Sequence, residues 1–360
     1  MIKIYLPNNF MGDKKIDRIY NCLSQKIYSE QGEQSLSFTY YGIKKELNSP
    51  AAIKEFLMAK DFYKYKFEHA NQFLSDLIDL PGQIKISSII SNTSKSESAQ
   101  KFCKKYSRKN FLKDYNNLLE YADLTISKFR KKAAHLSELH QYQIFDYCKL
   151  SSEDRNYILS AMDIPVCPYC NINYTINYIH ESRAQSTSDI DHFFLKSEYP
   201  EYSLCLYNFI PACPVCNQRI KGKKRMTRET HIYPHEDSFN GKSHFQVTNL
   251  LELLIQPQKH AKLELVDQTS DIRVEQSITD FRLNDRYKEF AYFAEELIEK
   301  AQIYNETYTK FLSEGIKELL EITSAKNLVF GTTLSEQEYG RLSLGKLKQD
   351  ILDQLGVFDI

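Results

Sequence analysis

Apolar residues recur every three or four positions along residues 51–80, which predicts an amphipathic helix that stops at Pro81-Gly82. Similar spacing predicts helices over about 98–118, 120–148, 276–326 and 335–356. A short helix up to Met162 is expected to begin at the capping pattern Ser151-x-x-Asp154. Before these, residues 2–6 form a short strand pattern, and the rest of the first 45 residues favours neither helix nor strand.

The pattern changes at Pro165, where short alternating segments such as 172–179 replace the helical spacing. Residues 261–275 alternate in the manner of a β-hairpin. We therefore expect a mainly α protein with a small central domain, α+β overall. We expect three regions. Residues 1–164 would form a mostly helical domain that offers a docking surface to a partner, residues 165–250 a compact centre, and residues 251–360 a hairpin followed by helices.

The charge balance excludes a global electrostatic attraction to nucleic acid or membrane, because 47 basic residues are matched by 47 acidic ones. Any polyanion binding must come from local patches. The first fifteen residues lack the apolar core of a signal peptide, and no run of 18 apolar residues occurs. A cytoplasmic protein with no membrane partner is the expectation.

Four of the eight cysteines form two Cys-x-x-Cys pairs, Cys167–Cys170 and Cys213–Cys216. Two-residue spacing lets two thiolates reach one ion from a single turn, and two such turns make a tetrahedral four-thiolate zinc site. A redox pair or a chance occurrence would be the alternative, but a redox motif needs one pair in a thioredoxin-like context. Because sulfur fills every ligand position, the predicted zinc is structural.

An adjacent acid and histidine lie between the two pairs. Alternation predicts a strand that ends at Asp191-His192, a second strand around Asn208, and a helix from Pro214. On that helix Asn217 directly follows the last cysteine, and Lys221 lies four residues further on the same face.

This order of residues resembles the HNH endonucleases, or ββα-metal nucleases, in the subgroup with a four-cysteine zinc site. Asn217 stands at the last motif position, as in the H-N-N variant. The stretch "DHFFLKSEYPEYSL…NFIPACPVCN" is similar to the nuclease subunits of Septu-type and retron-associated antiviral defence systems, except that Leu195 replaces the usual proline. The resemblance covers about 165–225, and a looser similarity reaches 277–287.

The resemblance implies roles for single residues and for a partner. Asn208 would be structural, closing the connecting loop and so orienting the His192 ring. Lys221, with Arg219, would contact the phosphate, and Lys196 is a weaker candidate. The related nucleases act with a separate ATPase subunit, so an ATPase partner in an antiviral complex is expected here too.

Phosphodiester hydrolysis asks for the same groups on chemical grounds. A base must activate water, and a cation must neutralise charge in the transition state. Histidine has the ordinary pKa that suits a base at neutral pH, which points to His192. The oxygens of Asp191 and Asn217 suit Mg²⁺ or Mn²⁺ better than zinc.

Alternatives remain open at this stage. The chain could be a zinc-stabilised nucleic-acid-binding or scaffold protein without turnover, or an HNH nuclease that cuts RNA in place of the favoured DNA. His231, His235 and Asp237 could approach the site, although such histidines are more often ordinary surface groups. A basic run next to the predicted helix would hold a nucleic-acid backbone; it contains Arg219, Lys223, Lys224 and Arg225.

Overall fold

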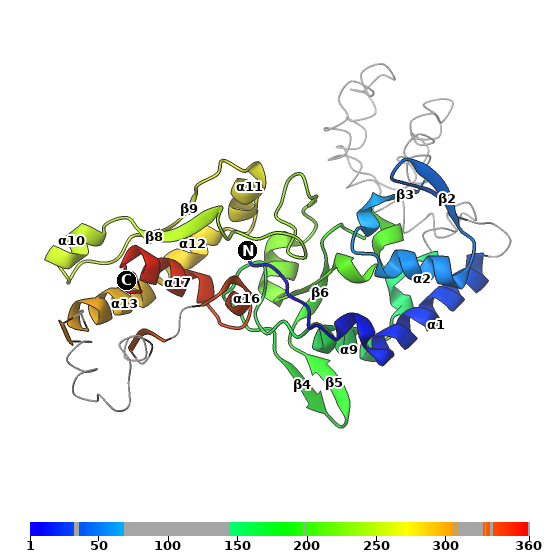
Figure 1. Cartoon of the computed structure of the whole chain (residues 1–360), viewed down its shortest axis with the longest axis horizontal. Coiled ribbons are helices and arrows are strands. Elements are labelled where there is room, and N and C mark those ends of the chain that lie inside the picture. The colour runs from blue at the N-terminus through cyan, green and yellow to red at the C-terminus, as the bar shows by residue number, and fades with distance from the viewer. Residues whose placement is uncertain are drawn as a thin grey trace, which may run out of the picture. The chain divides into compact units, whose positions relative to one another are not determined.

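The structure is a computed structural model that describes residues 1–31, 36–67, 144–196, 199–304, 307–308, 327, 329–331 and 334–358 (Figure 1). The described chain mixes helices with small antiparallel sheets. It forms two compact units. Unit 1 comprises Met1–Asp13, Ser152–Phe193 and Phe209–Ile360, and unit 2 comprises Lys14–Ser151 and Phe194–Asn208. This division differs from the three consecutive regions expected from the sequence, since unit 1 combines the N-terminal segment with the central and C-terminal regions.

The described residues of unit 2 pack two helices and a three-stranded sheet around an aromatic core. Helix α1 (Lys14–Gln31) precedes strands β1 (Leu36–Tyr40), β2 (Ile43–Leu47) and β3 (Tyr65–Phe67), which pair antiparallel in the order β2-β1-β3. Helix α2 (Pro50–Met58) begins at Ser49, whose side chain accepts the Ala52 amide, with proline at its first position. Phe56 of α2 packs against Tyr65, Phe67 and Phe145. Single 3-10 turns also occur in this unit, at Phe62–Lys64, Tyr147–Lys149, Pro200–Tyr202 and Leu206–Asn208.

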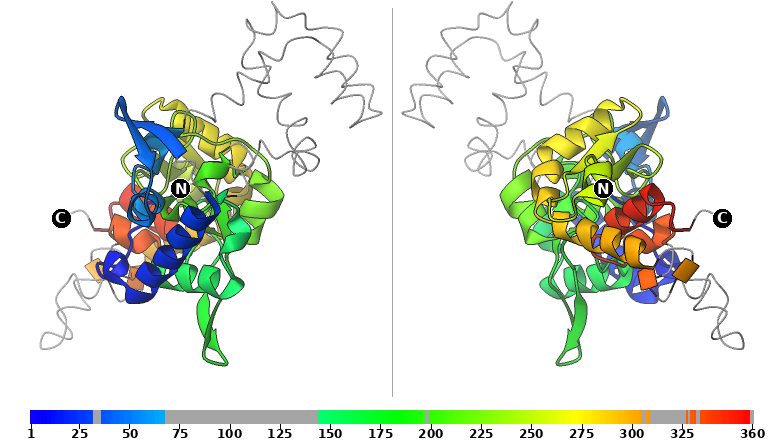
Figure 2. Two further views of the ribbon diagram at one scale, coloured as in Figure 1. Left: turned by 90° about the vertical axis from the view of Figure 1, so that its right-hand side faces the viewer. Right: turned by 90° about the vertical axis from the view of Figure 1, so that its left-hand side faces the viewer.

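The first half of unit 1 contains the cysteine pairs. A 3-10 turn at Phe10–Gly12 and helix α9 (Ser152–Met162) lead into it. A hairpin of β4 (Asn177–His180) and β5 (Arg183–Ser186) follows, and it projects from the unit in all views (Figures 1 and 2). Strand β6 (Asp189–His192) pairs antiparallel with β7 (Phe209–Ala212), with Asp191 opposite Ile210. A π-helix, η7 (Val215–Lys221), follows β7 directly.

The second half of unit 1 is mostly helical. Strands β8 (Ser243–Val247) and β9 (Leu263–Asp267) pair antiparallel on either side of helix α10 (Leu250–Ile255). The chain continues through α11 (Ile272–Asp280), α12 (Leu283–Lys288), α13 (Ala291–Ile303), α16 (Glu336–Tyr339) and α17 (Gly345–Gln354). Buried Val274, Leu283 and Leu347 contribute to the core of this half.

Several predicted elements are confirmed. The short helix before Pro165 is α9, and the strand that ends at Asp191-His192 is β6. The strand expected around Asn208 is β7, but it begins only at Phe209, and Asn208 itself ends a 3-10 turn. The helix expected from Pro214 is the π-helix η7, with Pro214 at its N-cap. Two helices, α16 and α17, lie within 335–356.

Other predictions are wrong. Residues 261–275 do not form a hairpin, because β9 pairs with β8 and residues from Ile272 onward are helical. The long helix from 276 is broken by Arg282, which adopts a left-handed backbone conformation, and again between α12 and α13. The helix at 51–80 ends at Met58, because Tyr65–Phe67 pairs with β1 as a strand.

The start of the chain was also misjudged. Residues 2–6 form no strand, although the Ile2 and Ile4 amides donate to the Pro168 and Pro234 carbonyls. The predicted helix at 98–118, most of the one at 120–148 and residues 309–326 of the one at 276–326 lie outside the described residues. Where the second of these ends, Tyr147–Lys149 form a 3-10 turn in place of an α-helix. Within the described part of the chain, no helix combines the length and apolar character that a membrane crossing requires.

Candidate functional site

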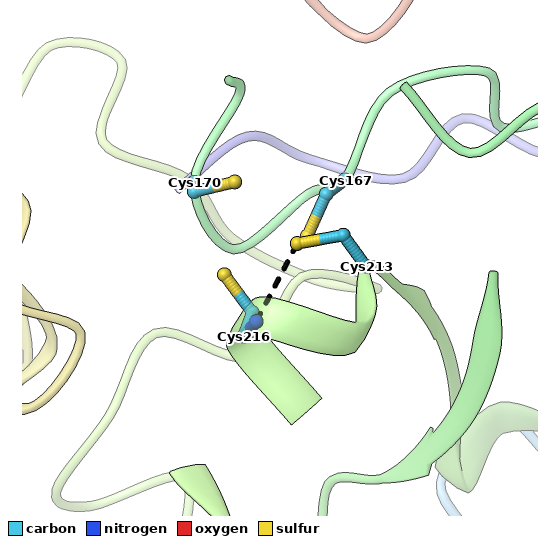
Figure 3. A group of neighbouring side chains, drawn as sticks. All are labelled: Cys167, Cys170, Cys213 and Cys216. Carbon is cyan, nitrogen blue, oxygen red and sulfur yellow. Dashed lines mark hydrogen bonds between the residues drawn. The ribbon is translucent and has the colours of Figure 1, made fainter. Parts of the chain in front are cut away.

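The four paired cysteines converge on one point in unit 1. Cys167 and Cys170 come from one tight turn, Cys213 lies between β7 and η7, and Cys216 lies in the first turn of η7 (Figure 3). Their sulfur atoms all lie within 4.8 Å of one another, and all four residues are buried. A zinc ion with Zn–S bonds of about 2.3 Å separates its tetrahedral ligands by about 3.8 Å, so this arrangement fits a structural zinc ion after a small contraction.

Hydrogen bonds to sulfur surround this cluster. The Asn173 side chain and the Cys216 amide donate to Cys213 Sγ at 3.3 and 3.4 Å. The Ile172 amide donates to Cys170 Sγ at 3.4 Å, and Arg286 Nη1 donates to Cys216 Sγ at 3.4 Å. Donors of this kind stabilise thiolates and orient metal ligands. The surroundings of the cluster are therefore those of a metal-binding group of thiolates.

The cysteine thiols of the cluster shift in opposite directions. Hydrogen bonds from the other three cysteines lower the pKa of the Cys213 thiol far below its ordinary value, whereas burial raises the pKa of the Cys167 thiol well above its own. Burial alone would lower the pKa of Arg286, but the charges of Cys216 and Cys170 outweigh it and raise that pKa. Arg286 thus supplies a permanent positive charge beside a site that carries net negative charge when four thiolates bind one Zn²⁺.

Strand β6 and helix η7 lie side by side in a fixed register. Asp189 and Asp191 are two residues apart on β6 and so share one face of the strand. Asn217 Nδ2 and Gln218 Nε2 donate to Asp189 Oδ2 at 3.0 and 2.8 Å. One turn further along η7, Lys221 reaches Asp191. The start of the helix therefore faces Asp189 and its end faces Asp191.

Asp191 forms a buried ion pair with Lys221. Lys221 Nζ lies 2.8 Å from Oδ1 and 2.7 Å from Oδ2, and it also donates to the His192 carbonyl oxygen at 2.5 Å. The Lys221 side chain is 0% exposed and that of Asp191 is 6% exposed. This geometry corrects the expectation that Lys221 contacts a phosphate, because its ammonium is fully engaged inside the protein.

Tyr169, inside the first cysteine pair, links the two sites. Its hydroxyl donates to Asp191 Oδ2 at 2.5 Å, and its ring stacks on Phe281 at 4.6 Å. Burial and the charge of Asp191 raise the pKa of Tyr169, so the phenol keeps the proton that it donates. A residue between two candidate zinc ligands therefore also fixes the Asp191 carboxylate.

The π-helical geometry of η7 brings Lys221 to its place. The Gly222 amide donates to the Asn217 carbonyl five residues earlier at 2.9 Å, which is the hydrogen bond of a π turn. Gly222 then ends the helix with φ +51°, a conformation that glycine adopts at little cost. Such π turns frequently occur at functional sites.

His192 and Asn208 occupy the two ends of the β6–β7 connection. The buried His192 ring packs edge-on against Phe209, its cross-strand neighbour, with ring centroids 5.3 Å apart. Within unit 2, the Asn208 side chain accepts the Phe194 amide at 2.8 Å and donates to the Phe194 and Tyr202 carbonyls at 3.0 Å each. Asn208 thereby ties both ends of the 194–208 segment together.

The structure does not unite all residues predicted for the divalent cation. Asn217 lies against Asp189, whereas Asp191 is engaged by Lys221 and Tyr169. Hard oxygen donors are present, as Mg²⁺ or Mn²⁺ requires. They fit such a cation only if the Lys221 ammonium leaves Asp191.

The predicted nucleic-acid contacts differ in their exposure. Arg219, Lys223 and Arg225 are exposed. Lys224 is half-buried and pairs with Asp280, donating to its carboxylate at 2.9 Å. The basic surface next to η7 is therefore made by Arg219, Lys223 and Arg225, and Lys224 holds α11 in place.

His231 is a buried component of this region that the sequence left undecided. Its Nε2 lies 3.0 Å from Asp280 Oδ2, and its Nδ1 lies 2.8 Å from Thr230 Oγ1. Burial, assisted by the charges of Lys221 and Lys224, lowers the pKa of His231 in spite of Asp280. His235 has a different neighbour: its Nε2–H donates to the Phe209 carbonyl oxygen at 2.9 Å, because a carbonyl can only accept.

We predict that stability falls as the pH falls through the ordinary histidine pKa of 6.5. The unfolded chain then takes up a proton that folded His231 refuses until a lower pH, so the stability present above 6.5 is lost progressively below it. Urea unfolding of zinc-loaded protein at a series of pH values measures this loss. His231→Gln should show a shallower pH dependence, whereas an unchanged slope would assign the loss to other groups.

Sequence reasoning missed four residues of the site: Tyr169, Asp189, Asp280 and Arg286. Three signals could have found them. Tyr169 lies inside a cysteine pair, Asp189 shares the alternation of Asp191, and 277–287 carries the looser family similarity. That segment provides Asp280 to His231, Phe281 to Tyr169 and Arg286 to Cys216.

Comparison with known proteins adds no family to this description, since no family profile, curated protein or solved structure matches the chain. The description of the site therefore rests on its own geometry. It consists of a four-cysteine cluster that fits a metal such as zinc, and a buried acid-histidine pair on the neighbouring strand.

Proposed function

We propose that this protein is a metal-dependent HNH endonuclease that hydrolyses phosphodiester bonds, with DNA favoured as the substrate and RNA possible. The observation that carries the proposal is the arrangement around the cysteine cluster. Strand β6 ends at Asp191-His192, β7 follows Asn208, and η7 presents Asn217 directly after Cys216 of the cluster. Two strands and a helix in this order are what the ββα-metal centre of that class requires.

In this proposal the residues have distinct tasks. His192 accepts the proton of the attacking water. Asp191 and Asn217 would hold Mg²⁺ or Mn²⁺, which would neutralise charge on the phosphate and support the leaving oxygen. Asn208 fixes the loop that follows His192 in sequence through its three hydrogen bonds. Zinc at the cysteines would have no chemical role and would hold the start of η7 against the turn that contains Cys167 and Cys170.

Nucleic acid would approach along η7 and the segment after it, because Arg219, Lys223 and Arg225 are exposed there. Contacts of this kind neutralise phosphates, do not read sequence and weaken with salt. A separate ATPase subunit and a place in an antiviral complex are further parts of the proposal, and they rest on the family resemblance.

A specific observation favours a second candidate function, a zinc-stabilised binding or scaffold protein without turnover. Lys221 neutralises Asp191 in the protein interior, which is also what a purely structural carboxylate would need. The two candidates differ in one property that can be measured, the cleavage of nucleic acid.

His192→Ala should lower cleavage of plasmid DNA by about 10²–10⁴-fold, the usual contribution of a general base. The assay uses zinc-loaded protein with Mg²⁺ or Mn²⁺, both alone and with the proteins that copurify with it. His180→Ala provides the matched control, since His180 is exposed on the projecting hairpin (Figure 1). Wild-type protein that cleaves neither DNA nor RNA in either preparation would support the scaffold function. Cleavage that survives His192→Ala would contradict the role of His192 and point to a contaminant or to a different base.

A further inference from the structure

Lys221 occupies the position beside Asp191 that a divalent cation would need. We propose that Lys221 is the resident counter-cation of Asp191, and that a divalent cation binds Asp191 only when the Lys221 ammonium withdraws. The inference deepens the proposed function, because it rests on Asp191 being a cation ligand of the nuclease site. It assigns Lys221 the role of a positioning residue that keeps the site closed to cations.

The hydrogen-bonding capacity of both groups supports this competition. An ammonium has three protons, and Lys221 directs all three to Asp191 Oδ1, Asp191 Oδ2 and the His192 carbonyl. A carboxylate has about four acceptor positions, of which Lys221 takes two and the Tyr169 hydroxyl takes a third. One position on Oδ1 remains, so the carboxylate cannot bind a cation through both oxygens.

Electrostatic repulsion closes the remaining position. Mg²⁺ or Mn²⁺ at about 2.1 Å from Oδ1 would lie less than about 5 Å from Nζ, because Nζ is itself 2.8 Å from Oδ1. The Lys221 side chain is completely buried, so little water screens two positive charges at that distance. The ammonium and the divalent cation therefore exclude each other.

The local fold allows Lys221 to be both held and released. Lys221 is the last residue of η7, and the exposed Gly222 and Lys223 follow it. Gly222 ends the helix at φ +51°, so a small backbone change there would carry the lysine stem outward. Tyr169 stays on Asp191 because it is fixed by Phe281, which keeps the carboxylate in place for a new ligand.

Removing the ammonium should strengthen cation binding. We expect Lys221→Met to bind Mn²⁺ about tenfold or more tightly than wild-type protein, since a nearby like charge is lost. Electron paramagnetic resonance of free Mn²⁺ measures this affinity on zinc-loaded protein without nucleic acid. Lys223→Met is the matched control, because Lys223 is exposed, lies two residues after Lys221 and carries the same charge. Equal affinities for wild type and Lys221→Met would overturn the proposal.

A second measurement uses the wild-type protein and so does not depend on the folding of a variant. Acetylation by an amine-reactive reagent, read by mass spectrometry, should leave Lys221 unmodified without Mn²⁺ and modify it as Mn²⁺ is added. Lys346 is an internal control, since it forms a comparable buried pair with Asp350 at 2.9 Å. Mn²⁺ that saturates the protein without exposing Lys221 would overturn the inference, as would the absence of Mn²⁺ binding in both proteins.

These outcomes are distinct from those of the cleavage assay. Tighter Mn²⁺ binding by Lys221→Met without any cleavage would leave the competition standing and remove the nuclease function. Cleavage that depends on His192, with Lys221 unmodified at saturating Mn²⁺, would support the nuclease function and overturn the competition between Lys221 and the cation.

Discussion

Cys213→Ser is expected to abolish zinc binding and to unfold unit 1. The four sulfur atoms lie within 4.8 Å of one another in the interior. Without a metal ion, nothing would hold the four cysteine side chains together there. Structural zinc contributes about 10–16 kcal/mol of apparent binding free energy at neutral pH in small zinc domains, which is more than the net stability of a typical domain. Loss of the ion should therefore release the start of η7 from the turn that contains Cys167 and Cys170, and with it the Asp191–Lys221 pair.

Metal analysis and circular dichroism test this prediction together. Wild-type protein should contain one zinc per cluster, and a strong chelator should cause the same loss of structure as Cys213→Ser. Cys205→Ala is the matched control, because Cys205 is equally buried but belongs to unit 2 and not to the cluster. Full zinc content in Cys213→Ser, or a chelator that leaves the structure unchanged, would contradict the assignment.

Asp191→Ala is expected to destabilise the protein by about 3–5 kcal/mol, because it leaves the ammonium of Lys221 buried without its partner. Lys221 would keep only its bond to the His192 carbonyl, and Tyr169 would lose its acceptor. Urea unfolding of zinc-loaded protein measures the loss. Asp189→Ala should cost less, since Asp189 is half-buried and accepts only from the neutral amides of Asn217 and Gln218.

The double variant Asp191→Leu with Lys221→Met separates the pair from its surroundings. Two apolar residues of similar size should recover most of the stability, because neither leaves a buried charge without a partner. A double variant as unstable as Asp191→Ala would mean that the stability comes from the packing of these side chains and not from compensation of charge.

Local patterns in the sequence were enough to predict the cysteine cluster and the neighbouring strand in unit 1. Cysteine spacing predicted the cluster, and alternation predicted the strand at Asp191-His192. Both depend on residues that are close in sequence, where periodicity and turn chemistry dominate. The capping pattern located α9 for the same reason.

The errors concern pairings between distant segments. β9 pairs with β8 across α10, and β3 pairs with β1 across α2, so the local patterns at 261–275 and 51–80 gave the wrong neighbours. The site shows the same limit. Asn217 and Lys221 were placed on one helix face, but only the register between η7 and β6 determines that they meet Asp189 and Asp191 respectively.

The central claim is that one zinc-held framework carries a second, oxygen-lined cation site at Asp191. Anomalous diffraction at the zinc and manganese edges, from crystals grown with Mn²⁺, tests it most directly. The account predicts a zinc peak among Cys167, Cys170, Cys213 and Cys216, and a manganese peak at Asp191 with the Lys221 side chain turned away. A cluster without zinc, or Asp191 still paired with Lys221 while manganese binds elsewhere, would contradict it.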